Sequence, residues 1–367
     1  MKIGLAKEIK KEEYRVGLTP LSSREYIDNG HSVMIESGAG LGSGFEDDEY
    51  KAQGCQVLVD KKKLFDESDM IVKVKEPLDS EYDLFHEDQI LYTYLHLAAD
   101  LKQTKALLSK KVKAVAYETV MEKDGSLPLL IPMSQIAGRL SVQEGAKYLE
   151  KSFGGRGILL GGVPGIKKGN VLIIGGGISG ANACKIAIGM GADVTIMDIS
   201  AKRLSELDDI FGNSIKTIYS NSYNIDELIR TADLIIGAVL IPGAVAPKVI
   251  KRDDLKKMKK GAVIVDIAVD QGGCTETTRP TDHSNPTYIV DGVVHYCVAN
   301  MPGAVSLSST YALTSVTNRY GLMIANMGLE KAAAASEAVL KGVNCYKGML
   351  TNRPVAEAHG LKYEKFN

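Results

Sequence analysis

The chain has 367 residues, of which 45% are hydrophobic and 24% charged, a composition typical of an ordinary globular protein with about two domains. Its 44 basic and 45 acidic side chains leave a net charge of −1, which argues against binding to nucleic acids or membrane surfaces. There is no apolar signal segment at the N-terminus, no strongly apolar run of about 18 residues, and no metal-ligand spacing among the five cysteines. We therefore expect a soluble cytoplasmic protein without a disulfide framework.

Residues 1–125 alternate short β-rich runs with helical patterns. The predicted strands lie at residues 2–6, 32–36, 70–74, 90–94 and 114–118. Such alternation is typical of an α/β domain with a parallel sheet.

A second α/β pattern begins at residue 171, with predicted strands at 171–174, 193–198, 234–240 and 262–268 and a last short run at 288–290. From residue 303 the pattern becomes helical. These last helices either extend the second domain or return to cover the first, and we favour the return. The sequence thus predicts two Rossmann-like doubly wound domains with a cleft between them. The discontinuous first domain comprises residues 1–128 plus 304–367, and the second domain comprises residues 129–303.

A glycine-rich turn, Gly175-Gly-Gly-Ile-Ser-Gly180, follows the apolar run 171–174 and opens a helical segment. This strand–turn–helix context predicts a dinucleotide site, with the pyrophosphate at the helix N-terminus. Asp198 ends the next strand, 18 residues after Gly180, where a carboxylate accepts from the ribose hydroxyls and disfavours a 2′-phosphate. The alternative is a glycine-rich turn without a ligand. Arg203 either lies on a solvated helix face or allows a 2′-phosphate to be partly tolerated.

Three residues of the first domain are candidates for chemistry, each with a less specific interpretation. Lys75 follows an apolar run at the carboxyl end of a predicted strand, where α/β proteins bind ligands. His96 lies in the apolar run Leu91-Tyr-Thr-Tyr-Leu-His-Leu, where a histidine is more often a hydrogen-bonded core residue. Arg15 is either a ligand-binding cation or a solvated loop charge.

Several segments, in order along nearly the whole chain, resemble the family of alanine dehydrogenase and the NAD-binding component of nicotinamide nucleotide transhydrogenase. They are Arg15-Val-Gly-Leu-Thr-Pro, Val72-Lys-Val-Lys-Glu-Pro77, Tyr94-Leu-His-Leu-Ala98, Pro132-Met-Ser-Gln-Ile-Ala-Gly138, Gly161-Gly-Val-Pro-Gly165, Asp266-Ile-Ala-Val-Asp-Gln-Gly-Gly273 and Ala299-Asn-Met-Pro-Gly303.

The resemblance implies an NAD-dependent oxidoreductase that reversibly deaminates L-alanine to pyruvate and ammonia, in a cytoplasmic homohexamer. By analogy, Arg15 and Lys75 bind the substrate, Lys75 also polarises its oxygen, and His96 is the general acid/base. Asp270 orients or stabilises the intermediate that carries ammonia. These roles suit the chemistry, since histidine exchanges protons near neutral pH and guanidinium binds carboxylates.

The glycine motif and the resemblance together predict the NAD contacts. They are Ser134, Gly175, Gly177, Ile178, Gly180, Asp198, Arg203, Ser220, Val239, Leu240, Ile267, Ala268, Val269, Asp270, Val298, Ala299, Asn300 and Met301. Arg279 is a weaker candidate. We expect no metal site, and we interpret Glu118 as a hydrogen-bond acceptor at a strand end.

Two alternatives are an NAD(H)-binding subunit of the transhydrogenase type and an NAD(H)-sensing module without an amino-acid substrate. The chain ends at Asn367 without a membrane-anchoring extension and keeps the Arg15, Lys75 and His96 segments. Both features favour the dehydrogenase.

Overall fold

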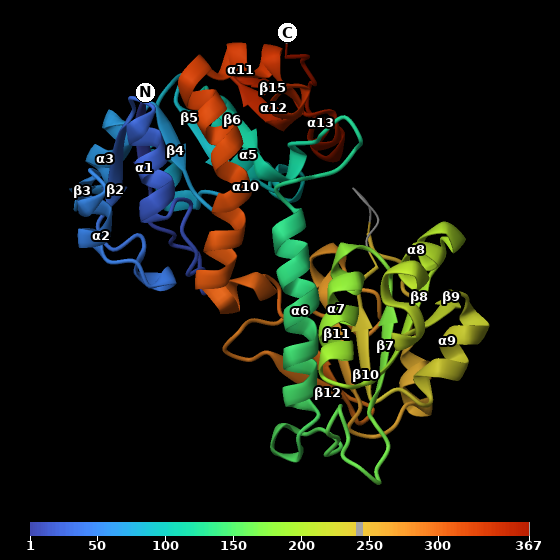
Figure 1. Ribbon diagram of the computed structural model, residues 1–367. Helices are drawn as coiled ribbons and strands as arrows, with labels where there is room; N and C mark the ends of the chain where they lie inside the picture. The colour runs from blue at the N-terminus through green and yellow to red at the C-terminus, as the bar shows by residue number, and fades with distance from the viewer. Residues whose placement is uncertain (240–244, 367) are drawn as a thin grey trace. The chain divides into compact units, whose positions relative to one another are not determined.

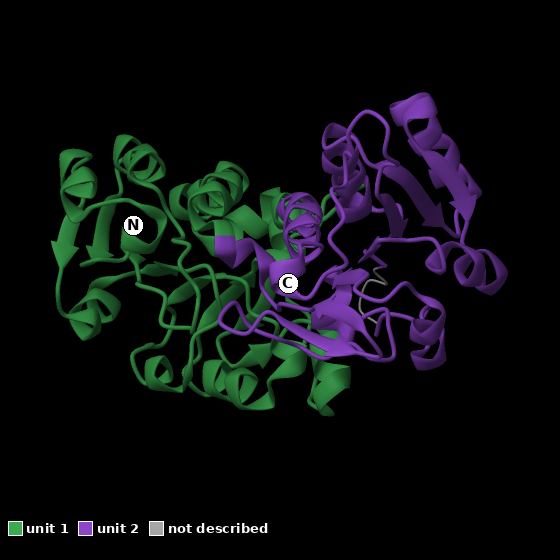
Figure 2. Cartoon of the chain, turned by 90° about the horizontal axis from the view of Figure 1, so that it is seen from below, with its two compact units in different colours: residues 1–133, 305–367 green, residues 134–304 purple. Residues whose placement is uncertain are grey.

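The computed structural model describes residues 1–239 and 245–366, which form two compact units (Figures 1 and 2). The first unit contains residues 1–133 and 305–367, and the second contains residues 134–304. The chain passes from one unit to the other within helix α6 (Ile131–Tyr148). Each unit is built on one mostly parallel β-sheet.

The sheet of the first unit has the strand order β15-β14-β6-β5-β4-β1-β2-β3 in the described part of the chain. Its strands are β1 (Lys2–Leu5), β2 (Ser32–Glu36), β3 (Gln56–Leu58), β4 (Met70–Val72), β5 (Ile90–Thr93), β6 (Lys113–Ala116), β14 (Val343–Tyr346) and β15 (Met349–Leu350). Strands β1 to β6 are parallel and follow the Rossmann order, which reverses direction between β1 and β4. Loops that follow β1 and β4 therefore leave the sheet at a topological switch point.

The C-terminal segment completes the first unit. Strand β14 pairs antiparallel with β6, and the hydroxyl of Tyr92 in β5 donates to the carbonyl of Thr317 in α10, at 2.9 Å. The helices of this unit are α1 (Pro20–Asp28), α2 (Asp47–Ala52), α3 (Lys61–Glu67), α4 (Asp79–Tyr82), α5 (Leu101–Ser109), α10 (Ser306–Met327), α11 (Leu329–Ala335), α12 (Glu337–Gly342) and α13 (Arg353–His359). Figure 2 shows this segment in the same colour as residues 1–133.

The sheet of the second unit has the order β12-β13-β11-β10-β7-β8-β9, and only the edge strand β12 is antiparallel to its neighbour among the described strands. The strands are β7 (Asn170–Ile174), β8 (Asp193–Asp198), β9 (Lys216–Tyr219), β10 (Leu234–Gly237), β11 (Val263–Asp266), β12 (Thr287–Val290) and β13 (Val293–Tyr296). The helices besides α6 are α7 (Ile178–Gly189), α8 (Ala201–Phe211) and α9 (Ser222–Ile229). No helix in residues 1–239 and 245–366 is both long and apolar enough to cross a membrane.

The predicted α/β fold, with two doubly wound sheets and a discontinuous first unit, is confirmed. The helical pattern predicted from residue 303 is confirmed by α10 to α13, but the short hairpin of β14 and β15 in the same segment was not predicted. Four-residue and two-residue strands give too little alternation to stand out from the helices around them. They are stabilised instead by pairing, β14 with β6 and β15 with β14.

Candidate active site

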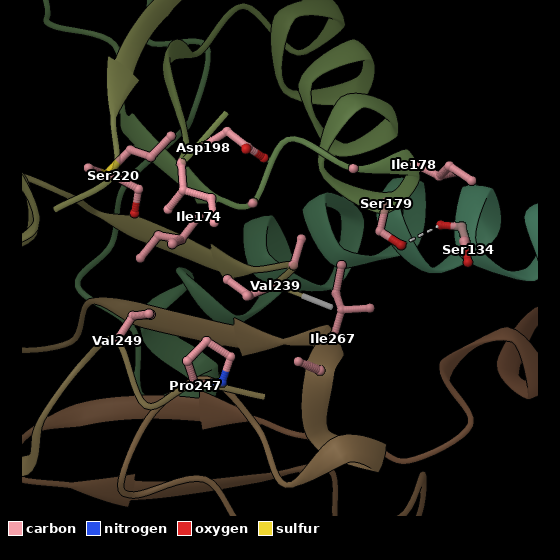
Figure 3. Close-up of a pocket in the computed structure, with 16 residues that line it drawn as sticks. Ser134, Ile174, Ile178, Ser179, Asp198, Ser220, Val239, Pro247, Val249 and Ile267 are labelled. Atoms are coloured by element: carbon pink, nitrogen blue, oxygen red, sulfur yellow. Dashed lines mark hydrogen bonds between the residues drawn. The ribbon is translucent and has the colours of Figure 1, made fainter. Parts of the chain in front are cut away.

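A cavity of about 570 Å³ lies in the second unit at the carboxyl ends of β7 and β10 (Figure 3). Strand β8 lies on the other side of β7, and β11 lies on the other side of β10, so the cavity occupies the topological switch point of this sheet. In Figure 3, Asp198 and Ser220 lie toward one end of the cavity, and Ser134 and Ser179 toward the other.

The glycine turn is tight toward the sheet and open toward the cavity. Gly175 has φ +106°, and a Cβ there would lie 2.6 Å from the carbonyl oxygen of Ala238. A Cβ on Gly180 would lie 1.8 Å from the carbonyl oxygen of Gly175. At Gly177, which is the N-cap of α7 and lines the cavity, a Cβ would meet nothing within 4 Å. The turn therefore fits a dinucleotide pyrophosphate, which needs close approach to backbone N–H groups at a helix N-terminus.

Asp198 is held by two backbone N–H groups. Its Oδ2 accepts from Gly176 at 2.7 Å, and its Oδ1 accepts from Ser200 at 2.8 Å. A carboxylate has about four acceptor positions, so it retains capacity for ribose hydroxyls. Arg203 instead donates from Nε to the carbonyl of Gly176 at 2.7 Å and from Nη1 to Glu206 at 2.8 Å. Its guanidinium therefore stabilises the glycine turn.

Nine of the predicted NAD contacts line the cavity: Ser134, Gly175, Gly177, Ile178, Asp198, Ser220, Val239, Ile267 and Ala268. Gly180 and Arg203 contact the turn from outside the cavity lining. Val269, Asp270, Val298, Ala299, Asn300 and Met301 are not part of the lining, and Leu240 lies outside the described residues. The remaining lining residues, which the sequence prediction missed, are Ile174, Ser179, Met197, Ile199, Ala238, Pro247 and Val249. Most of these flank the strand ends β7, β8 and β10, and that position could have indicated them.

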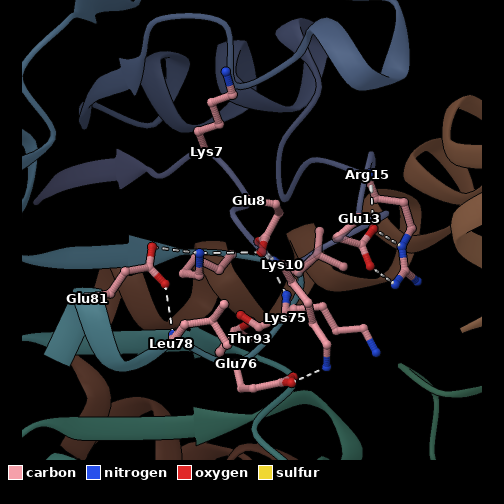
Figure 4. Close-up of polar contacts among 12 residues, drawn as sticks. Lys7, Glu8, Lys10, Glu13, Arg15, Lys75, Glu76, Leu78, Glu81 and Thr93 are labelled. Carbon is pink, nitrogen blue, oxygen red and sulfur yellow. Dashed lines mark hydrogen bonds and ion pairs between the residues drawn. The ribbon is translucent and has the colours of Figure 1, made fainter. Parts of the chain in front are cut away.

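Arg15 lies in the first unit, in the loop after β1, and is only 3% exposed. Its Nε donates to Glu13 Oε1 at 2.6 Å, and its Nη2 donates to Glu13 Oε2 at 2.5 Å (Figure 4). Burial alone would lower the pKa of Arg15, but the hydrogen bonds and charge of Glu13 outweigh burial and raise it. The interpretation of Arg15 as a solvated loop charge was therefore wrong. Glu13 was missed, although its place two residues before Arg15 was a usable signal.

Lys75 follows β4 and is half-buried near Arg15 and Glu13 (Figure 4). Burial lowers the pKa of its ammonium, and the neighbouring positive charge of Arg15 lowers it further. The hydroxyl of Thr93, the last residue of β5, donates to the carbonyl of Lys75 at 3.0 Å. Arg15, Lys75 and Glu13 together leave a net positive charge at the switch point, which favours an anionic ligand.

A buried ion network supports this region from behind. Lys73, whose side chain is fully buried, pairs with Glu81 at 3.1 Å and with Glu8 at 3.4 Å. Oε1 of Glu8 also accepts the backbone N–H of Val74 at 2.6 Å and that of Lys75 at 3.3 Å. Burial raises the pKa of Glu8 despite the nearby ammonium of Lys73. This carboxylate connects the β1 loop to the backbone that carries Lys75.

His96 is exposed, unlike Tyr94, Leu95 and Leu97 around it. Its backbone is left-handed, with φ 52° and ψ 36°, a conformation that costs a non-glycine residue about 1–2 kcal/mol. Its ring is nearly parallel to that of Tyr94, with 9° between the planes and 6.0 Å between centroids. The interpretation of His96 as a core histidine was therefore wrong.

Asp270 belongs to the second unit and is exposed on the short 3-10 helix η7 (Ile267–Gln271) after β11. The buried carboxylate of Asp266 holds this turn: it accepts the N–H groups of Ala268 at 3.1 Å and Cys274 at 2.8 Å, and the hydroxyl of Thr278 at 2.5 Å. These hydrogen bonds fix the turn at the end of β11.

The other titratable candidates have structural partners. Glu118, on the 3-10 helix η3 (Tyr117–Thr119) after β6, accepts the N–H groups of Leu95 and His96, which confirms its predicted role at a strand end. His295 is buried and hydrogen-bonded to Thr277 at 2.8 Å, and burial lowers its pKa. In residues 1–239 and 245–366, no three His, Cys, Asp or Glu side chains are grouped as a metal site requires.

Comparison with protein families assigns both parts of the chain. Residues 4–137 match the family model described as "Alanine dehydrogenase/PNT, N-terminal domain", and residues 141–353 match "Alanine dehydrogenase/PNT, C-terminal domain". The chain belongs to the alanine dehydrogenase/PNT family. The resemblance predicted from the sequence motifs is confirmed.

Members of this family with curated names are similar over their full lengths. The alanine dehydrogenase of Methanococcus maripaludis is 56% identical over 364 residues, which are 99% of this chain and 98% of that protein. Alanine dehydrogenase 2 of Staphylococcus aureus is 54% identical over 365 residues, with the same coverage.

Solved structures agree. An L-alanine dehydrogenase superposes with a TM-score of 0.96 at 51% identity, covering 98% of this chain and 99% of that one. A transhydrogenase from Sinorhizobium meliloti has a TM-score of 0.82 at 22% identity, covering 96% and 99%, and shows a shared fold alone.

Proposed function

We propose that this protein catalyses the reversible, NAD-dependent oxidative deamination of L-alanine to pyruvate and ammonia. The observation that carries the proposal is the convergence of Arg15, Lys75 and His96 at one edge of the first sheet. They follow β1, β4 and β5, which are adjacent parallel strands whose carboxyl ends meet. These side chains suit the binding and deamination of a small amino acid, since they supply a buried guanidinium, an ammonium of lowered pKa and an exposed imidazole.

The second unit would hold NAD in the cavity, with the pyrophosphate at Gly177 and the adenosine ribose at Asp198. When bound, NAD accepts the hydride that the α-carbon of alanine loses. The free charge of Asp198 disfavours a 2′-phosphate, so we infer a preference for NAD over NADP.

In the first unit, Arg15 would bind the substrate carboxylate, because guanidinium presents paired donors in the geometry of a carboxylate. Lys75 would donate to the oxygen of the carbinolamine that forms when water adds to the imine. The lowered pKa makes this ammonium a stronger donor to that oxygen than an ordinary lysine.

His96 would take the proton from the attacking water and return it to the departing ammonia. Its exposed ring, fixed in direction by the left-handed backbone, is suited to this exchange. Asp270, on its held turn, would stabilise the cationic, ammonia-bearing intermediate. By resemblance we also infer a cytoplasmic homohexamer, for which sedimentation should give six times 39.5 kDa.

The test is NADH formation on mixing the protein with NAD and L-alanine. For His96→Asn, we expect an unchanged melting temperature and NAD affinity with turnover lower by roughly 10²–10⁴-fold. Asparagine is the right substitute because it tolerates the left-handed backbone. Wild-type protein that binds NAD but forms no NADH would contradict the proposed activity.

A further inference from the structure

The backbone around His96 is paired on each side of the residue. Leu95 donates its N–H to both carboxylate oxygens of Glu118, each at 3.2 Å, and accepts at its carbonyl from Nε2 of the buried Gln103 at 3.1 Å. His96 donates its N–H to Oε1 of Glu118 at 2.6 Å, and its carbonyl accepts from the N–H of Ala99 at 3.0 Å. A left-handed histidine persists only where its surroundings determine it.

Glu118 is itself anchored on both sides. The neighbouring Tyr117 is fully buried, and its hydroxyl donates to the carbonyl of Lys73 at 3.1 Å. On the other side, the hydroxyl of Thr119 accepts from Nδ2 of Asn344 in β14 at 2.6 Å. The carboxylate is therefore attached to the central sheet and to the returning C-terminal strand, and its position does not depend on the His96 loop.

The charge on Glu118 suits this role. A carboxylate accepts several N–H groups at once, and such charge-assisted hydrogen bonds are about twice as strong as neutral ones. Here one carboxylate accepts the N–H groups of two successive residues, so it fixes the orientation of the peptide between Leu95 and His96. That peptide sets the direction in which the imidazole leaves the chain.

We propose that Glu118 is the positioning residue of His96: its carboxylate holds His96 in the left-handed conformation that presents the imidazole to substrate. This inference rests on the proposed function of His96 as the acid/base. Glu118 acts through the backbone and does not itself touch substrate.

The test compares Glu118→Ala and Glu118→Gln with the wild type and with a control, Asp60→Ala. Asp60 caps α3 in the same unit by accepting the N–H groups of Lys62 and Lys63, so its loss removes a similar pair of bonds away from the site. Turnover, KM for NAD, affinity for pyruvate and melting temperature are measured for each full-length protein.

For Glu118→Ala we expect turnover to fall by roughly 10- to 100-fold, since small misplacement of a reacting group has effects of that size. KM for NAD and pyruvate affinity should stay near wild type. Glu118→Gln, which keeps an acceptor oxygen, should recover most of the rate, and Asp60→Ala should lose melting temperature without losing turnover. In a His96→Asn background, Glu118→Ala should slow turnover no further, because both changes act through one group.

Two results would overturn the inference while the proposed function stands. In the first, His96→Asn is slow, but Glu118→Ala turns over like Asp60→Ala per folded molecule. In the second, Glu118→Ala slows the His96→Asn protein by its full factor. If His96→Asn itself keeps wild-type turnover, the catalytic role fails, and with it the positioning role. The His96→Asn variant by itself therefore distinguishes failure of the catalytic role from failure of the positioning role alone.

Discussion

Gly180 tests whether close packing is what requires glycine at the third position of the turn. An ideal Cβ there would lie 1.8 Å from the carbonyl oxygen of Gly175, a backbone atom, and 3.4 Å from the side chain of Ile173. For Gly180→Ala, helix α7 and the turn must separate by about 1.2 Å before that contact reaches 3.0 Å. Both are backbone segments, so no side chain can relieve the overlap.

The expected cost follows from two opposing effects. Overpacking of this kind costs roughly 1–3 kcal/mol, or more where backbone must move. Alanine stabilises a helix interior by about 1 kcal/mol relative to glycine. The net destabilisation of up to about 2 kcal/mol should lower the melting temperature by up to roughly 8 °C for a unit of this size. Because the Gly175 carbonyl belongs to the turn that we propose holds the pyrophosphate, the Kd for NAD should also rise, by tenfold for each ~1.4 kcal/mol of binding free energy lost.

Two other glycines serve for comparison, Gly189 in α7 and Gly177 at its N-cap. Gly189 is exposed at the C-terminal end of α7, and a Cβ there would meet nothing within 4 Å. Gly189→Ala should raise stability by about 0.4–1 kcal/mol and leave the Kd for NAD unchanged. At Gly177 the Cβ also meets no protein atom but enters the cavity, so Gly177→Ala should keep its melting temperature and lose NAD affinity.

Calorimetric melting and titration with NADH fluorescence measure both quantities for the three variants. Close packing at Gly180 is ruled out as the requirement if Gly180→Ala melts like Gly189→Ala and binds NAD like the wild type. A loss of affinity without a loss of stability at Gly180 would also contradict it, since that pattern is expected only at Gly177.

Four further predictions concern the two sites and the architecture. Asp198→Asn keeps an acceptor for the glycine turn but removes the charge, so kcat/KM with NADP should rise relative to NAD; an unchanged ratio would place cofactor choice elsewhere. Arg15→Lys loses the paired donors of the guanidinium, so the binding of alanine and pyruvate should weaken by about 1.5–3 kcal/mol, which raises their KM values. KM for NAD should stay constant. KM values for alanine and pyruvate equal to those of the wild type would contradict carboxylate binding. Because the pKa of Lys75 is lowered below 10.5, pyruvate affinity should fall as pH rises through that lowered pKa, and Lys75→Met should lack this pH dependence. A 1–133 fragment, which lacks β14 and α10, should be insoluble or molten by near-ultraviolet circular dichroism, and a well-folded fragment would show that the returning segment is dispensable.

The glycine turn was predictable from the sequence because most of its determinants are local. A strand, three glycines, a helix and Asp198 all lie within residues 170–198, and Gly180 is required by a backbone contact inside that segment, whereas the contact that excludes a side chain at Gly175 comes from Ala238 after β10. The second strand was predicted with the same ends that the structure has, at residues 193–198. Such signals depend on neighbours along the chain, which the sequence displays directly.

The character of Arg15 and His96 was decided by tertiary structure. Arg15 is buried because Glu13 pairs with it and β4, far along the chain, lies beside β1. In the run before His96, the side chains from Leu91 to Leu95 are buried, and the left-handed backbone at residue 96 then turns the imidazole outward. Apolar neighbours in sequence could not indicate that turn, because the carboxylate that stabilises it follows another strand, 22 residues later. Burial and orientation depend on which strands become adjacent, and that adjacency is a property of the folded sheet.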